Sequence, residues 1–200
     1  YALLVFFGAL SMYFFVRSLQ SRRGRDLGLW ALTSALALCS HYFAVFTVAI
    51  EAAWLLWALR ASWRLVLPAL GVVAATGAAL LPLIAAQINP THIGWIEDRP
   101  LPLRLIDTWG SFLIGETGWV IAEPPRDRYA LVPVVLVAAG LALAMFRGTF
   151  RERRGAALGL ILGLGVAGLA TAAALAGKDY VVERNLLPAL IPLAAAVAIG

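Results

Sequence analysis

Charged side chains are scarce in this sequence. They make up 14% of its 200 residues, whereas 62% are hydrophobic; a soluble domain has about a quarter charged and about half apolar residues. The single cysteine, Cys39, lies within an apolar stretch, which excludes a disulfide framework and a cysteine metal site. No internal repeat is present. These absences exclude an ordinary water-soluble core and favour an integral membrane protein.

Long apolar blocks account for the excess of hydrophobic residues. Seven can be separated, each near the roughly 20 residues that a helix needs to cross a bilayer. The sequence predicts an all-α integral membrane protein with about seven transmembrane helices, two of them forming a short hairpin, in one transmembrane domain over residues 1–200. The expected helices are 1–16, 27–40, 43–59, 65–87, 130–146, 156–176 and 186–200, with one long extracytoplasmic loop at 88–128. Because the chain begins and stops inside apolar blocks, we expect a fragment of a longer protein.

The net charge of +5 comes from basic residues in short connections between apolar blocks. This pattern indicates membrane topology and not a nucleic-acid partner, because short cytoplasmic loops favour Lys and Arg. The sequence predicts a multi-pass protein of the plasma (inner) membrane. The cations expected inside are Arg17, Arg22, Arg23, Arg25, Arg60, Arg64, Arg147, Arg151, Arg153 and Arg154, and those expected outside are Arg99, Arg104, Arg126, Arg128, Lys178 and Arg184.

Residues 27–59 are too long for one span, since a helix of that length reaches about 50 Å and the hydrocarbon core is about 30 Å thick. The polar group from Cys39 to Tyr42 is the natural turn of a hairpin. Its arms are short, so the turn should lie below the outer surface, where polar backbone is tolerated only beside protein or a watery cavity. We expect His41 and Tyr42 to line a recessed cavity.

Two of the polar residues in this hairpin are candidates for chemistry. His41 suits a hydrogen bond to a substrate hydroxyl or phosphate oxygen, or a proton-carrying role, and the alternative is a satisfied turn residue. Glu51 lies near the middle of one arm, where an ionised carboxylate costs at least about 2.5 kcal/mol unless it is paired or faces water. A structural hydrogen bond, a protonated state and a direct role all remain open for Glu51.

A second candidate site precedes the last helix, which we expect to begin near Asn185 with Pro188 in its first turn. Lys178, Tyr180 and Arg184 lie together there on a short outer loop. Cations beside a helix N-terminus suit an anionic phosphate, because exposed N–H groups and the helix dipole add to the side-chain charge. The alternative is that these cations contact lipid headgroups.

The long outer loop mixes aromatic and charged residues, as an amphipathic segment at the headgroup level does. Glu97, Asp98 and Asp107 are potential ligands of a divalent cation, but their spacing fits no defined metal motif, and we interpret them as solvated loop charges. No cofactor is assigned, and His92 is interpreted as a surface residue. Elsewhere, Gly155, Gly159 and Gly163 recur at four-residue spacing, which predicts close helix packing.

Three stretches together carry a resemblance. They are Tyr1-Ala2-Leu3-Leu4 with Arg17 beyond it, Ser40-His41-Tyr42-Phe43, and Glu183-Arg184-Asn185-Leu186-Leu187-Pro188. They resemble bacterial relatives of the dolichyl-phosphate-mannose protein mannosyltransferases, family-39-like members of the GT-C glycosyltransferase superfamily. The resemblance implies a hexosyltransferase of the cell envelope that takes a sugar, such as mannose, from a polyprenyl-phosphate donor at the extracytoplasmic face of the bilayer.

The resemblance also implies roles for residues. His41, Tyr42, Lys178, Tyr180 and Arg184 would bind the donor in one shared extracytoplasmic pocket. The family's catalytic base is an aspartate in the first outer loop, and no residue here matches it. The base is therefore expected upstream of Tyr1, and the chain alone is expected to be inactive.

The chain departs from the family at one position, because an aromatic residue often follows the arginine matched by Arg184, where this chain has Asn185. A transporter or flippase of lipid-linked or small polar substrates is the alternative function. Intramembrane Glu51 and the Gly/Pro-interrupted helices would form its pathway. A purely structural membrane subunit is a third possibility.

Overall fold

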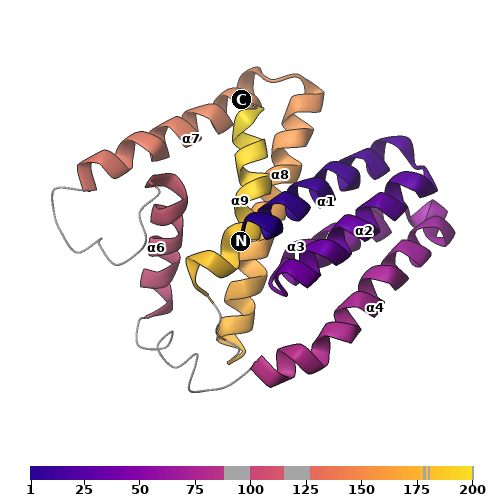
Figure 1. The fold of residues 1–200 in the computed structure, drawn as a ribbon. Helices are drawn as coiled ribbons and strands as arrows, with labels where there is room; N and C mark the ends of the chain where they lie inside the picture. The colour runs from indigo at the N-terminus through magenta and orange to yellow at the C-terminus, as the bar shows by residue number, and fades with distance from the viewer. Residues whose placement is uncertain (88–99, 115–126, 178, 180, 200) are drawn as a thin grey trace. The chain divides into compact units, whose positions relative to one another are not determined.

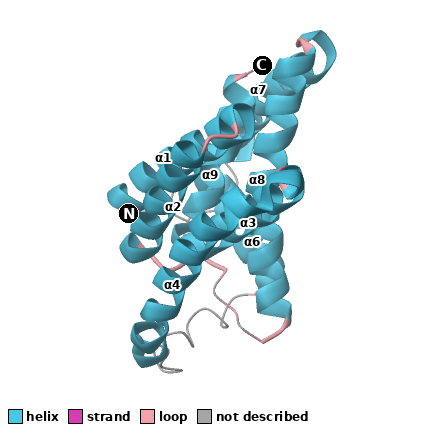
Figure 2. Ribbon diagram, turned by 90° about the vertical axis from the view of Figure 1, so that its right-hand side faces the viewer, coloured by secondary structure: helices cyan, strands magenta, loops and turns pink. Residues whose placement is uncertain are grey.

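The chain is all-helical in a computed structural model, which describes residues 1–87, 100–114, 127–177, 179 and 181–199 (Figures 1 and 2). The described residues form eight α-helices: α1 (Ala2–Ser21), α2 (Gly24–Ser40), α3 (Ala44–Ala58), α4 (Trp63–Gln87), α6 (Leu101–Ile114), α7 (Asp127–Arg147), α8 (Phe150–Leu175) and α9 (Glu183–Ala198). Helices over 2–21, 60–86 and 150–175 are long and apolar enough to cross a membrane. The all-α prediction is confirmed, and these long helices are what a multi-pass membrane protein needs.

The chain divides into two compact units, residues 1–90 and 91–200. In the first, α1 packs along α2, α2 and α3 form a hairpin, and α4 packs against α2 (Figure 1). In the second, α8 and α9 pack along each other, and α6 and α7 both contact α9. Many apolar side chains in both units remain exposed, which suits a lipid environment.

The hairpin reverses at His41–Phe43, between the end of α2 and the start of α3. His41 has an extended backbone, with φ −164° and ψ 120°, and its N–H still donates to the carbonyl of Ala37 at 2.9 Å. At about 1.5 Å per residue, each arm is about 22 to 26 Å long, shorter than a hydrocarbon core of about 30 Å. The chain therefore turns where the sequence predicts, and the arms are short.

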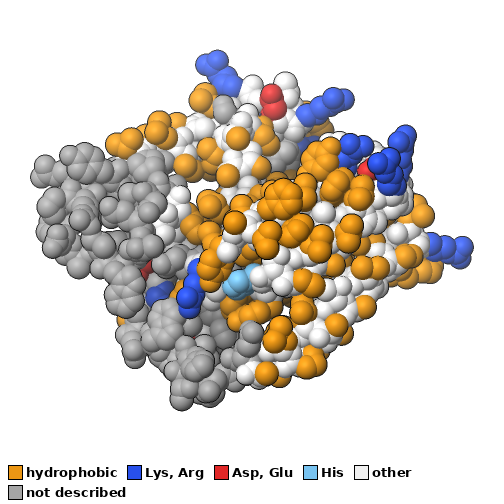
Figure 3. Space-filling view, in the orientation of Figure 1, with side chains coloured by type: hydrophobic (Ala, Val, Ile, Leu, Met, Phe, Trp, Pro, Cys, Tyr) orange, Lys and Arg blue, Asp and Glu red, His pale blue; other side chains and the backbone are white. Residues whose placement is uncertain are grey.

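The other two reversals of this unit lie at its opposite end, where arginine side chains gather (Figures 1 and 3). Arg22 occupies a left-handed conformation between α1 and α2, with φ 53°. Near it, Asp26 is buried and accepts a hydrogen bond from Ser21 Oγ at 2.5 Å, while Arg17 Nε lies 3.7 Å from its carboxylate. The basic connections of this unit thus share one end, and the hairpin turn occupies the other.

The predicted boundary of the helix at 156–176 is wrong by about two turns, because α8 begins at Phe150. A capping box fixes this start: Thr149 Oγ1 accepts from the Glu152 N–H at 3.4 Å, and Glu152 Oε2 accepts from the Thr149 N–H at 2.6 Å. The side-chain bonds satisfy helical N–H groups that would otherwise lack partners. The connection from α7 therefore shrinks to residues 148–149, and the basic residues after it lie on the helix.

The predicted long loop contains a helix, α6, whose polar residues face the protein. Arg104, Asp107 and Thr108 are buried, at 7%, 5% and 1% exposure, whereas Leu103 and Ile106 are 46% and 56% exposed. The interpretation of Asp107 as a solvated charge is therefore wrong. Glu97, Asp98 and His92 lie outside the described residues. An outward apolar face suits a helix lying in the headgroup region.

The glycine stripe of α8 lies against α9, which confirms the predicted close packing. A Cβ on Gly159 would lie 2.5 Å from the Pro192 carbonyl oxygen and 2.9 Å from Ala196 Cβ. A Cβ on Gly163 would collide with the Leu193 side chain. The two helices can approach this closely only because the stripe carries no side chains.

Gly159→Leu should force α8 and α9 apart and lower the melting temperature of the purified full-length protein by about 5 °C or more, since overpacking costs about 1–3 kcal/mol. Thermal unfolding in lipid or detergent measures the change. Gly168→Leu is the matched control on the same helix, because a Cβ there meets no atom within 4 Å. Equal melting temperatures for the two variants would contradict this account of the packing.

Candidate functional site

A partly buried ion pair joins α6 to Asp179, which precedes α9. The Arg104 guanidinium, from α6, donates one hydrogen bond to each carboxylate oxygen of Asp179, the one to Oδ1 at 2.8 Å, and another to the Val181 carbonyl at 2.9 Å. The Val181 N–H donates to Asp179 Oδ1 at 3.2 Å. We call this arrangement the Arg104–Asp179 clamp. It ties α6 to the short segment that leads into α9.

The Asp179 carboxyl group of the clamp is ionised at neutral pH. Hydrogen bonding from Arg104 holds the pKa of Asp179 below its usual range, although partial burial works in the opposite direction. The side chains of Arg104 and Asp179 are only 8% and 18% exposed. A two-point bond between a planar guanidinium and a carboxylate fixes orientation as well as distance. Asp179 and Val181 are therefore held in a defined position against α6.

Helix α9 begins at Glu183, two residues before the predicted start. Val182 is the extended N-cap residue, and its carbonyl accepts from the N–H groups of Asn185 and Leu186 at 3.0 and 3.3 Å. Arg184 is exposed in the first turn, while Asn185 is buried. Pro188 consequently lies in the second turn and not in the first. Arg184 is thus a cation at the positive end of a helix dipole, a place that suits an anion.

The sequence did not reveal Arg104 and Asp179 as partners. They are 75 residues apart, and each lies in a segment predicted to be a loop. The sequence does hold a sign of an amphipathic helix here. Apolar Leu103 and Ile106 are three residues apart, as are polar Arg104 and Asp107, so each pair lies on one helix face. The predicted residues Lys178 and Tyr180 lie outside the described part of the chain.

At the hairpin turn, His41 lies in a cluster of aromatic rings. Its ring centre is 5.2 Å from that of Tyr1, 5.3 Å from that of Tyr42 and 5.4 Å from that of Phe43. Its Nδ1 is 3.4 Å from the Phe43 N–H, which donates to it. Both His41 and Tyr42 are half-buried. The cluster closes this end of the hairpin and leaves part of each polar ring accessible.

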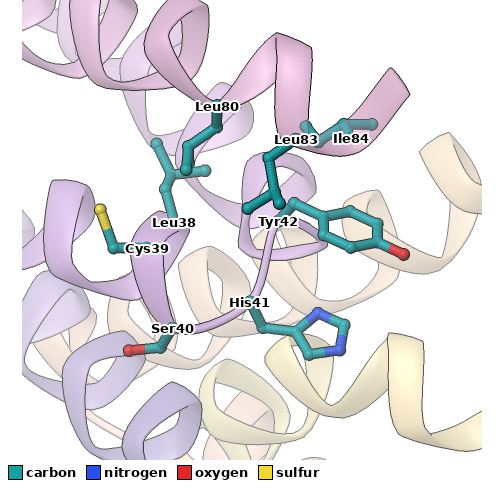
Figure 4. Close-up of a pocket in the computed structure, with 8 residues that line it drawn as sticks. All are labelled: Leu38, Cys39, Ser40, His41, Tyr42, Leu80, Leu83 and Ile84. Atoms are coloured by element: carbon teal, nitrogen blue, oxygen red, sulfur yellow. The ribbon is translucent and has the colours of Figure 1, made fainter. Parts of the chain in front are cut away.

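A cavity of about 350 Å³ lies between this turn and α4 (Figure 4). Its lining residues are Leu38, Cys39, Ser40, His41, Tyr42, Leu80, Leu83 and Ile84. The α4 side is apolar, and the Tyr42 ring lies beside Leu83 and Ile84 in Figure 4. The turn supplies the polar groups. The predicted residues His41 and Tyr42 therefore do line a cavity, with a volume in the lower range of small-molecule sites, about 300–1,000 Å³.

Glu51 is completely buried, at 0% exposure. Its Oε2 accepts hydrogen bonds from Ser11 Oγ of α1 at 2.7 Å and from Trp30 Nε1 of α2 at 2.8 Å. The partners that the sequence could not identify are thus neutral groups on two other helices. Glu51 lies in the core of the first unit and not on the lining of the cavity.

The candidate residues fall into separate groups. His41, Tyr42 and Glu51 belong to the unit of residues 1–90, and Arg184 belongs to that of residues 91–200. The shared pocket for His41 and Arg184 stays a prediction. Within the described ranges, no three His, Cys, Asp or Glu side chains gather as metal ligands would. Comparisons with known family models, curated proteins and solved structures found no match to this chain.

Proposed function

We propose that the chain is part of a multi-pass membrane glycosyltransferase, which moves a hexose such as mannose from a polyprenyl-phosphate donor to an acceptor at the extracytoplasmic face of the plasma membrane. The observation that carries the proposal is the exposed Arg184 in the first turn of α9. It stands in the stretch of residues 183–188 that resembles the mannosyltransferase family. A cation at a helix N-terminus suits the phosphate of such a donor.

The arrangement of charge supports an extracytoplasmic site. In the unit of residues 1–90, the basic connections gather at one end and the hairpin turn lies at the other (Figure 3). With the basic end in the cytoplasm, His41 and Tyr42 belong near the outer surface. The seven apolar helices α1–α4 and α7–α9 then form the membrane part, and α6 lies in the headgroup layer.

In the proposed reaction, an acceptor hydroxyl attacks the anomeric carbon of the donor sugar. A bond forms from the hydroxyl oxygen to that carbon, and the bond from the carbon to the phosphate oxygen breaks. The lipid phosphate leaves with the electron pair, and the hydroxyl proton passes to a general base, which in the resembled family is an aspartate of the first outer loop. Arg184 stabilises the negative charge that grows on the phosphate. The resemblance implies that His41 and Tyr42 also bind the donor.

The Arg104–Asp179 clamp supports the role of Arg184. Charge stabilisation is effective when the cation is held in place before the reaction, so that little reorganisation is needed. The clamp bonds the connection to α6 through Asp179 and the Val181 carbonyl, only a few residues before Arg184. The bonds to Asp179 and Val181 thus hold the chain close to the start of α9, where Arg184 lies.

The proposal is tested with the full-length protein in lipid vesicles that contain a polyprenyl-phosphate hexose labelled in the sugar. We expect polyprenyl phosphate to appear in step with labelled acceptor, because transfer breaks the bond between sugar and phosphate. Movement of intact lipid-linked sugar or of a polar solute across the vesicle wall, without bond cleavage, would instead identify a transporter, the function that a buried intramembrane Glu51 favours.

A further inference from the structure

Three helices meet at one oxygen atom in the core of the first unit. Glu51 of α3 accepts hydrogen bonds at Oε2 from Ser11 of α1 and from Trp30 of α2, at 2.7 and 2.8 Å. The Ser11 hydroxyl lies 2.8 Å from the Ser34 hydroxyl of α2, which extends the chain of polar groups. Every member of this cluster is buried, with at most 1% exposure.

The second carboxyl oxygen of Glu51 has no hydrogen-bond partner, although it is fully buried. No Lys, Arg or His among the described residues forms an ion pair with this carboxyl group. The helices packed against α3, with the 3-10 turn of residues 60–62, carry these titratable side chains, none of which bonds to Glu51: Tyr13, Arg17, Arg25, Asp26, Cys39, Arg60 and Arg64. Neutral donors therefore bond to Oε2 of Glu51, and no hydrogen-bond donor or cation bonds to Oε1.

This asymmetry distinguishes the two protonation states. An ionised carboxylate shares its charge between both oxygens, and a buried charge without a paired cation is strongly disfavoured. A neutral carboxylic acid is itself asymmetric, because its carbonyl oxygen accepts hydrogen bonds while its hydroxyl oxygen carries the proton. Two donors on Oε2 and none on Oε1 match the neutral acid.

Another buried polar group of α3 lies close to Glu51 along the helix. Thr47 is one turn before Glu51, and residues four apart are neighbours on a helix face. Its hydroxyl oxygen is also buried and without a hydrogen-bond partner. The two unused oxygens of this part of the core thus belong to neighbouring turns of α3.

We propose that Glu51 is a proton-binding site: it holds a proton on Oε1 at neutral pH, and the neutral acid joins α1, α2 and α3 through its carbonyl oxygen. The ligand is a proton and not a metal ion or a substrate group. In this state the three helices are joined by hydrogen bonds that need no ion inside the membrane. The inference stands on the geometry of residues 1–90 and is independent of the proposed transferase activity.

Infrared spectroscopy of the full-length protein in lipid tests the proposal. With carbon-13 in its glutamate carboxyl groups, the protein should show at neutral pH an isotope-shifted carbonyl band of a protonated acid, and Glu51→Gln should remove that band. Trp30→Phe should shift the same band, because it removes one hydrogen bond from the carbonyl oxygen. A wild-type minus Glu51→Gln difference that contains only the bands of an ionised carboxylate would overturn the proposal.

Thermal unfolding provides a second readout. The amide of Glu51→Gln reproduces a neutral acceptor and a donor, so its melting temperature should stay within about 3 °C of wild type, while Glu51→Ala should fall by about 5 °C or more. Equal losses for the two variants would overturn the proposal, since an anion tolerates neither change. If Glu51→Gln fails to fold, we count that result as a loss of stability equal to that of Glu51→Ala. The carbonyl band of the protonated acid and its shift in Trp30→Phe then still report the protonation state of Glu51.

Discussion

Replacing Arg184 by alanine in the full-length protein is expected to lower sugar transfer about 100-fold, the typical effect of removing one preorganised group that stabilises transition-state charge. In the proposed reaction the lipid phosphate gains negative charge as it leaves, and our proposal assigns its stabilisation to Arg184, which is exposed at the start of α9. The loss should fall mainly on kcat, because the charge is greatest in the transition state. Steady-state kinetics with a labelled polyprenyl-phosphate hexose measure both kcat and KM.

Arg151→Ala is the matched control for this prediction. Arg151 is likewise an exposed arginine in the first turn of a long helix, α8, but it lies at the end that we assign to the cytoplasm. Its replacement should change transfer less than about twofold. Arg184→Lys should recover part of the rate, since it keeps the charge and loses the planar fork. An unchanged rate in Arg184→Ala, or an equal loss in Arg151→Ala, would reject the assigned role.

The second large effect is expected on stability, from Arg104→Ala. This change leaves the partly buried Asp179 carboxylate without its cation, and an uncompensated polar group in such a place costs about 1–3 kcal/mol. The Val181 carbonyl loses a hydrogen bond at the same time. The full-length protein should unfold at a clearly lower temperature or denaturant concentration, and the α8–α9 connection should become accessible to protease.

A double-mutant cycle separates the interaction energy of Arg104 with Asp179 from the effect of shortening each side chain alone. The pair Arg104→Ala with Asp179→Ala should be less destabilised than the sum of the single variants, because no uncompensated buried charge remains. Additive losses would show that the two side chains do not interact in solution.

Acid provides a check on the same clamp. Since the pKa of Asp179 is depressed in the folded state, its contribution to stability is present above its unfolded pKa, about 3.9, and is lost as the pH falls through the lower folded value. The wild-type protein should therefore lose this contribution in strong acid. In the Arg104→Ala variant, the free energy of unfolding should not show this decrease at low pH.

The sequence by itself determined the features that depend on local pattern. Apolar blocks predict helices because each helix in lipid satisfies its own backbone, and the described part of the chain is all-helical. The reversal at His41 follows from the excess length of residues 27–59 and the polar residues within it. The four-residue spacing of Gly159 and Gly163 places them on one helix face, and that face lies against α9.

Only the tertiary structure decided which distant polar groups meet. The partners of Glu51 are 40 and 21 residues away, and Arg104 bonds to a carboxylate 75 residues away. The hydrophobic pattern shows that a buried polar side chain needs a partner. It does not show which distant side chain the packing of the helices brings within hydrogen-bond distance. The sequence did not predict that the polar face of α6 points inward, for the same reason. A charged residue that another helix buries cannot be distinguished in the sequence from one that water surrounds.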